Sequence, residues 1–285
     1  MQTQTQLQTK YQYLDSTFNA LDTHHYALDI TMSEEKLSLC LIQNQKIIGL
    51  RYYQLPNIEK PGGYQAWQAC LQNDNWFTLD FKNKRLFLDT KKYTLVPEAL
   101  FDAQYAESYL KLLHDNLSDN KVFYSKLHQF QATLVFAISA VWNKLIDQFF
   151  NPLEIKHQNE TLLGVGYRFT NKKNQLVVNV NHKEVTILYL YEGAIKFLNT
   201  FDAEFDTDLT YFILSVADLL KLPSDKFEIL ILGQINQTAS SIGLLKKYIS
   251  QVNFCNRLNS LEYPLAFREF QEQNHYLEIH TLLCE

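Results

Sequence analysis

Two stretches of the sequence share one pattern and decide the expected fold. LSLCLIQNQKIIGLRYY at residues 37–53 and VTILYLYEGAIKFLNTF at residues 185–201 align without a gap at an offset of 148 residues. In each stretch an apolar, β-prone run reaches a two-residue turn, Asn44-Gln45 or Glu192-Gly193, and a second such run follows. Order, spacing and turn coincide, which indicates a duplicated structural unit, with a coincidental meander as the alternative.

The match extends upstream to one more strand in each half. Leu28-Asp29-Ile30-Thr31 corresponds to Val178-Asn179-Val180-Asn181 once two residues are dropped from the turn that follows. Each half is therefore predicted to begin with a three-strand meander.

Helices and strands alternate after each meander. In the first half we expect a helix around 66–71, extended chain over 85–96, a helix from Pro97, strands at 122–124 and 133–136, and a helix over 138–150. In the second half we expect a helix over 207–220, a buried parallel strand over 227–232 and a helix from about 240 to 250. The sequence thus predicts an α/β protein with a partly disordered leader at 1–25 and two lobes, 26–152 and 153–285.

This doubled plan resembles that of the actin, sugar kinase and Hsp70 group. It is more similar still to an uncharacterised bacterial family, a domain of unknown function with an actin-like ATPase fold. The segments YTLVPEALF at 93–101, IKFLNTF at 195–201 and FEILILG at 227–233 carry that resemblance. The resemblance covers the chain from about Tyr26. It implies duplicated actin-like, ribonuclease H-like lobes, each a mixed sheet with a three-strand meander and flanking helices, and no established activity.

The resemblance also implies a nucleotide cleft that the residues can test. In active members the first turn of each meander carries glycine and an Asp that holds the metal's water shell. Here Asp29 is kept without a glycine after it, Asn179 is neutral, and Gly233 alone remains of the Gly-Gly turn that accommodates adenosine. Thr31 and Asn181 add side-chain oxygens. These five residues are the expected vestigial nucleotide site; no cofactor is expected there, with ATP and Mg²⁺ as the alternative.

Three other patterns suggest chemistry, and each has a simpler interpretation. His24-His25 invites a metal, but in an extended segment the two rings would face opposite ways, which favours surface histidines. Gly164-Val165-Gly166 has two of the three glycines of a dinucleotide fingerprint and precedes a strand instead of following one. The acidic cluster of Asp202, Glu204, Asp206 and Asp208 lacks the glycine of a calcium loop, so we expect Asp206 or Thr207 to cap the following helix.

Composition narrows the class of protein. The formal net charge is −5 and no run of lysines and arginines occurs, which disfavours nucleic acid as a partner. The longest apolar stretch, 132–142, is too short to span a membrane, and the polar amino terminus is not a secretory signal. Four scattered cysteines, Cys40, Cys70, Cys255 and Cys284, are expected to be free thiols. We therefore expect a cytoplasmic protein.

The expected function follows from the degenerate nucleotide motifs. The leading hypothesis is a non-enzymatic, pseudo-ATPase member of the actin-like fold with a protein-interaction or scaffold role, whose partner is another protein or a second copy. The alternative is an ATP-binding actin-like ATPase that uses Asp29 and unconventional phosphate turns.

Overall fold

The chain divides into two compact units. The computed structural model describes residues 9–81, 83–150, 153–169, 175–181, 183–223, 227–264 and 275–284. Unit 1 comprises Met1–Gln158 and Ser260–Arg268, and unit 2 comprises Asn159–Asn259 and Glu269–Glu285. Sequence reasoning divided the chain at 152/153 and did not foresee that a segment near the carboxyl end belongs to the first unit.

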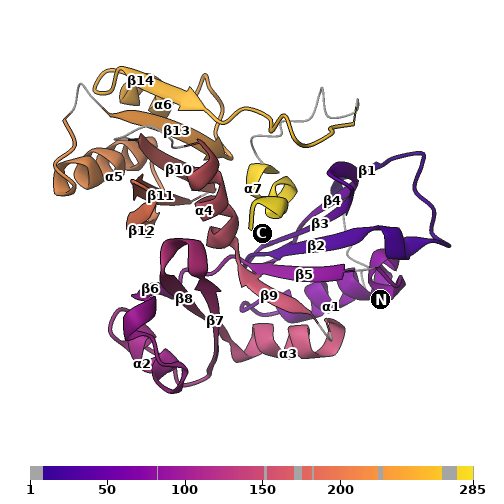
Figure 1. Ribbon diagram of the computed structural model, residues 1–285. Helices are drawn as coiled ribbons and strands as arrows, with labels where there is room; N and C mark the ends of the chain where they lie inside the picture. The colour runs from indigo at the N-terminus through magenta and orange to yellow at the C-terminus, as the bar shows by residue number, and fades with distance from the viewer. Residues whose placement is uncertain are drawn as a thin grey trace. The chain divides into compact units, whose positions relative to one another are not determined.

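Unit 1 is built around a mixed six-stranded sheet (Figure 1). In spatial order its strands are β1 (Thr9–Leu14), β4 (Lys46–Gln54), β3 (Lys36–Gln43), β2 (Ala27–Met32), β5 (Asn83–Leu88) and β9 (Glu154–His157). The strands β1 to β4 pair antiparallel, and β2, β5 and β9 pair parallel. The predicted meander of β2, β3 and β4 is confirmed. In addition, residues assigned to the leader form β1, which extends the sheet at its edge.

Unit 2 repeats this plan with a five-stranded mixed sheet. Its strands are, in spatial order, β12 (Ala194–Asp202), β11 (Glu184–Tyr191), β10 (Gln175–Asn181), β13 (Glu228–Gly233) and β14 (Gln251–Phe254). Strands β10, β11 and β12 form the antiparallel meander, and β13 and β14 continue it in parallel. The apolar run at 227–232 was thus correctly predicted as a buried parallel strand.

The two meanders agree in backbone detail as well as in order. Both β3 with β11 and β4 with β12 keep the offset of 148 residues at each end. The pairing register breaks between Leu41 and Ile42 in the first meander and between Tyr189 and Leu190 in the second, which is the same place at that offset. Such a break is a β-bulge, in which one strand holds an extra residue. A shared bulge supports duplication far better than strand order alone.

The connecting turns are also equivalent. Asn44 and Gln45 have φ angles of 45° and 66°, and Glu192 and Gly193 have 53° and 77°. Two successive positive φ angles are the geometry of a tight hairpin whose twist matches that of the flanking strands. The hairpin turns predicted at both positions are therefore confirmed.

A third, smaller sheet lies within unit 1. It consists of β6 (Tyr93–Pro97), β8 (Ala132–Ser139) and β7 (Asn120–Leu127), with β8 in the middle, and we call residues 93–139 the β7 module. The short helix α2 (Ala106–Lys111) packs on it, where Leu110 meets Val135 in a small apolar core (Figure 1). The helix expected from Pro97 is thus confined to α2 and two 3₁₀ turns. The extended chain expected over 85–96 is split between β5 and β6 of two different sheets.

Helices complete both units. The longer ones are α1 (Gly63–Asn73), α3 (Ala140–Phe149), α4 (Gln158–Phe169) and α5 (Asp206–Leu219), and the short ones beside α2 are α6 (Ser240–Leu245) and α7 (Tyr276–Ile279). In unit 1, α1 and α3 meet through Trp67 and Trp142, whose ring centroids are 6.5 Å apart. In unit 2, Ile213 of α5 and Ile242 of α6 share a core with Ile231 of β13. Burying such a side chain stabilises the fold by about 1.5–3 kcal/mol.

Two of the motifs noted in the sequence have structural roles in unit 2. Gly164 and Gly166 lie inside α4, where a Cβ on Gly164 would stand 2.1 Å from the carbonyl oxygen of Leu283. These glycines therefore allow close packing. In the acidic cluster, the carboxylate of Asp208 accepts hydrogen bonds from the N–H groups of Glu204 and Phe205, each at 2.9 Å. The described capping contacts come from Asp208, whereas the prediction named Asp206 or Thr207, and the side chain of Asp206 lies outside the described residues.

Candidate nucleotide site

Asp29, the residue expected to hold a metal's water shell, lies in the middle of β2 and is 1% exposed. Its neighbour on β5 is Arg85, which donates Nε–H to Oδ1 and Nη2–H to Oδ2, both at 2.8 Å. Two parallel hydrogen bonds of this kind are the strongest geometry for an arginine and a carboxylate. Both oxygens are thus engaged by a buried cation, and the residue is not part of the turn.

Sequence reasoning missed Arg85. Strand β5, NKRLFL, is polar at its start, so Arg85 alone gave little signal. The signal was available in β2, where Asp29 is the one charge in the largely apolar ALDITM, and an isolated charge in a buried strand needs a partner such as Arg85. Strands β2 and β5 are neighbours in the sheet, and their register places the two residues side by side.

The turn from β2 to β3 is unfavourable for a phosphate. Glu34 and Glu35 follow Ser33, and both are exposed. The sequence-based prediction for this turn rested on the missing glycine and did not include these two acidic residues. Their backbone carbonyls accept hydrogen bonds from Ile58 at 3.0 Å and Leu55 at 2.8 Å. The turn therefore presents two carboxylates where a phosphate site needs backbone N–H groups. Two like unit charges about 4 Å apart repel by about 1 kcal/mol even in bulk water.

The remaining candidate of unit 1, Thr31, is buried in β2 beside Ser38 of β3. It shares a face with Asp29, since residues two apart in a strand point the same way. The structure thus brings Asp29 and Thr31 to one face of the sheet, inside the strand and away from the turn.

Unit 2 brings the other three candidates to one place. Gly233 ends β13 with φ +94°, and a Cβ there would lie 2.1 Å from the carbonyl oxygen of Val180 and 2.7 Å from Oδ1 of Asn179. The N–H of Gln234 donates to that carbonyl at 2.6 Å. Asn179 and Asn181 are half-buried on β10. Gly233 is required here by its φ angle and by the approach of two backbones.

The correspondence between Asp29 and Asn179 needs correction. Asp29 pairs with Cys40, and the pair at the same offset of 148 in unit 2 is Val177 with Leu188. The two meanders therefore align without a gap through all three strands, and no residues are dropped. The counterpart of Asp29 is Val177, and the neighbour of Val177 on β13 is Leu230, in the place of Arg85. An apolar pair in unit 2 thus replaces the ion pair of unit 1.

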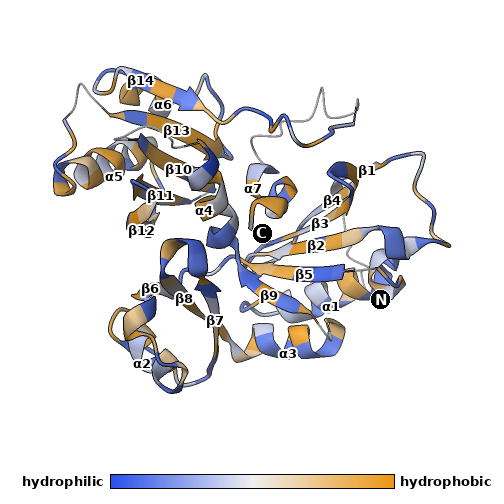
Figure 2. Cartoon of the chain, viewed as in Figure 1, coloured by the Kyte–Doolittle hydropathy of each residue, from blue (hydrophilic) through white to orange (hydrophobic). Residues whose placement is uncertain are grey.

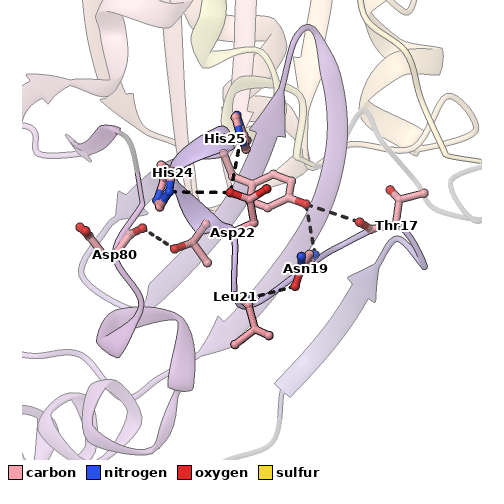
Figure 3. A network of polar contacts seen from close by, with 9 residues as sticks. Thr17, Asn19, Leu21, Asp22, His24, His25 and Asp80 are labelled. Carbon is pink, nitrogen blue, oxygen red and sulfur yellow. Dashed lines mark hydrogen bonds and ion pairs between the residues drawn. The ribbon is translucent and has the colours of Figure 1, made fainter.

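His24 and His25 differ from the expected arrangement. They lie in a 3₁₀ turn, Thr23–His25, and both Nε2 atoms approach Oδ1 of Asp22, at 3.7 and 3.4 Å (Figure 3). The prediction that the rings face opposite ways is wrong because it assumed an extended chain. Their side chains are 70% and 62% exposed. Within the described part of the chain, no group of three or more His, Cys, Asp or Glu side chains could hold a metal ion.

Two buried histidines, His157 and His280, have pKa values well below the usual value of a histidine. His157 is fully buried, lies between the rings of Tyr93 and Phe136, and has Nε2 2.9 Å from the carbonyl oxygen of Thr90. Burial lowers its pKa to about 4. His280 in unit 2 stacks on Tyr276, and burial lowers its pKa to about 4 as well. Both are neutral core residues, because a charge there would be desolvated.

The fold of the two units is that of the actin-like ATPases, with candidate phosphate turns that lack glycine. A protein of Bacteroides thetaiotaomicron with an actin-like ATPase fold and unknown function is similar at a TM-score of 0.76 and 18% identity, over 84% of this chain and 94% of that one. A structure of the PilM–PilN type IV pilus biogenesis complex is similar at 0.62 and 11%, over 90% and 96%. The chain belongs to a family of proteins of unknown function, DUF3822, which matches residues 15–252. No curated protein matches the sequence.

Proposed function

We propose that this chain is a non-enzymatic member of the actin-like fold that acts by binding another protein. The observation that carries the first half of the proposal is the buried ion pair of Asp29 and Arg85. An Asp that positions a hydrated magnesium ion needs at least one carboxylate oxygen directed at the metal's water. Here Arg85 engages both oxygens within the sheet, which supports a structural role for Asp29 instead.

The acidic β2–β3 turn supports the same conclusion. Glu34 and Glu35 oppose the negative charge of a triphosphate, and Oε2 of Glu34 accepts a hydrogen bond from Asn57 at 2.7 Å. In unit 2, the position equivalent to Asp29 is the apolar Val177. These features of the two halves support a role without ATP hydrolysis.

The β7 module supports protein binding. Large apolar side chains are exposed around α2, where Leu112 is 80% and Leu113 68% exposed, and Leu100 and Tyr105 are more than half exposed. Part of the ribbon around α2 has the hydrophobic colour in Figure 2. Aromatic and apolar side chains presented to solvent are typical of protein interfaces. The similar PilM structure was solved as a complex with PilN, so the fold accommodates protein partners.

The location we propose is the cytoplasm. Cys40, Cys70 and Cys255 are free thiols, as expected in a reducing compartment, while the side chain of Cys284 lies outside the described residues. Among the described residues, no helix is long and apolar enough to cross a membrane.

The experiment that tests the absence of ATPase chemistry is a thermal-shift titration with magnesium ATP, together with a phosphate-release assay. A ligand at 100 times its dissociation constant adds about 2.7 kcal/mol to stability. We expect no shift at millimolar nucleotide and no phosphate release. A shift that is present in the wild type and absent in Asp29→Val/Arg85→Leu, which copies the apolar pair of unit 2, would contradict the proposal.

Protein binding is tested by affinity capture from the source cells. The variant Leu112→Ser/Leu113→Ser should lose a partner that the wild type captures. Leu219→Ser is the matched control, because Leu219 is equally exposed, at 68%, but lies on α5 of unit 2. A partner retained equally by all three chains would contradict the role of the exposed leucines beside α2.

One observation favours the alternative, an ATP-binding protein with unconventional phosphate turns. Gly233 keeps a positive φ at the end of β13, where the actin-like resemblance places the adenosine turn. This would support binding through unit 2 without hydrolysis. A thermal shift with ATP that also occurs with adenosine, without phosphate release, would favour this alternative.

A further inference from the structure

Strand β7 occupies the edge of the three-stranded sheet. It pairs with β8 along its whole length, from Asn120 with Ser139 to Leu127 with Ala132, and the sheet order is β6-β8-β7. Among the described residues no strand is hydrogen-bonded to its other edge, although β9 of the larger sheet passes close to β7. Burial agrees, since no residue of β7 before Leu127 is buried, whereas six of the eight residues of β8 are. An unpaired strand edge offers a row of N–H and C=O groups to another extended chain.

There is room for such a chain beside the start of β7. An open hollow of about 990 Å³ is lined by Asn120 and Lys121 of β7 and by Asn143, Lys144 and Asp147 of α3, among others. The hollow therefore adjoins the first residues of β7. Amide and charged side chains line it, which suits a polar backbone better than an apolar ligand.

The charges on β7 indicate which kind of chain could bind at its edge. Lys121 and Lys126 are exposed near its two ends, and the strand contains no acidic residue. Lys121 lies 3.7 Å from Asp147, and Lys126 has no ion-pair partner among the described residues. A symmetric antiparallel pairing of two copies would bring four lysines and no acidic residue to one pair of strands. Charges of a single sign disfavour that pairing, so a second copy is the poorer occupant.

We propose that the free edge of β7 binds an extended acidic segment of a partner protein, which adds a fourth strand to the sheet. The acidic residues pair with Lys121 and Lys126. An apolar residue between them packs on Tyr124, which is 47% exposed and contacts Phe101 at a ring-centroid distance of 5.0 Å. This inference rests on the proposed protein-binding function and assigns it a surface and a partner chemistry.

The test uses the full chain and synthetic fluorescent peptides as long as β7. The first peptide alternates threonine and valine with a glutamate near each end. The second has lysine in place of glutamate, and the third is the acidic peptide with alternate backbone nitrogens methylated on its pairing edge. We expect fluorescence anisotropy to show binding of the first peptide and at least tenfold weaker binding of the other two, because they lose charge complementarity or backbone pairing.

Matched protein variants locate the site. Lys126→Glu should weaken binding of the acidic peptide by about fivefold, as expected for an exposed charge pair worth up to about 1 kcal/mol. Lys126→Gln should give a smaller loss. Lys247→Glu, an equally exposed lysine of unit 2, should leave the affinity unchanged.

Several outcomes would overturn the inference. These are failure of the acidic peptide to bind, equal affinity for the acidic and lysine peptides, or equal affinity for the methylated one. Sedimentation that shows a dimer strengthened by Lys126→Glu would instead identify a second copy as the occupant. None of these outcomes involves nucleotide, so failure here is distinguishable from an ATPase activity that would overturn the proposed function.

Discussion

Arg85 binds both carboxylate oxygens of Asp29 across two neighbouring parallel strands, at 2.8 Å each. At the equivalent place in unit 2 the neighbours are Val177 and Leu230. One sheet position is therefore filled by an ion pair in one half of the molecule and by an apolar pair in the other. This difference suggests how the stability of the protein changes when Asp29 or Arg85 is replaced.

Removal of Asp29 alone should be costly. Asp29→Ala leaves the guanidinium of Arg85 buried without its partner, and breaking a buried pair in this way costs about 3–5 kcal/mol. The double variant Asp29→Val/Arg85→Leu should lose much less, because no charge remains buried. Urea unfolding of the single and double variants checks this. A double variant that is less stable than Asp29→Ala would contradict the interpretation of the pair as structural.

Gly233 and Gly243 should respond in opposite ways to alanine. Gly233→Ala places a Cβ 2.1 Å from the carbonyl oxygen of Val180 at a φ of +94°, so we expect a loss of more than about 1 kcal/mol. Gly243 lies in α6, and a Cβ there meets nothing within 4 Å. Gly243→Ala should therefore stabilise the protein by about 0.5–1 kcal/mol. Equal effects of the two substitutions on the melting temperature would show that the β13 turn is not constrained as described.

The equivalent turns predict a stabilising substitution. Gln45 has φ 66° at the position that Gly193 occupies in unit 2, and a left-handed conformation costs a residue with a side chain about 1–2 kcal/mol. Gln45→Gly should gain about 1 kcal/mol, and Gly193→Ala should lose about the same. Denaturant unfolding of the two variants measures both signs. Loss of stability in Gln45→Gly would mean that its side chain contributes more than the relieved strain.

Stability should fall in mild acid because of His157. Its folded pKa of about 4 is below its usual value of 6.5, so the unfolded chain binds the proton more readily. The stabilisation from neutral His157 is complete above pH 6.5 and is lost as pH falls from 6.5 to 4, by about 3 kcal/mol in total. His280 adds a similar dependence in unit 2.

A variant isolates this dependence from that of the carboxylates. His157→Gln keeps a donor for the carbonyl of Thr90 and removes the titrating group. Its unfolding free energy should fall less steeply between pH 6.5 and 5 than that of the wild type. Parallel pH profiles for His157→Gln and the wild type would contradict the low pKa.

The strands and hairpins were predictable because their signals are local. Alternating or continuous apolar runs around 37–53 and 185–201, each broken by a two-residue turn, specify a hairpin whatever lies elsewhere. The structure of segments that depend on partners distant in the sequence was harder to predict. Thr9–Leu14 reads as polar leader and becomes a strand only because β4 offers it an edge.

The residues of the candidate site could be named from the sequence, but their structural roles could not be predicted from it. Asp29 was identified from a resemblance, but its partner Arg85 is 56 positions away in sequence, and only the pairing of β2 with β5 brings the two together. Likewise, the choice of Asn179 as the twin of Asp29 relied on an inferred deletion. Extending the gap-free offset of 148 residues to Asp29 would have given Val177, and the pairing register confirms Val177 as the counterpart.

The bulge shared by the two hairpins is a trace of duplication in this chain that its side chains do not provide. Beyond a bulge every residue has exchanged faces, so losing the extra residue in one copy would turn a strand's buried side chains outward all at once. No single substitution can repair such a change. The irregularity between Leu41 and Ile42, and its twin between Tyr189 and Leu190, can therefore outlast the similarity of the residues around them. Relatives too divergent to align by sequence can be ordered by whether one, both or neither of their hairpins retains it.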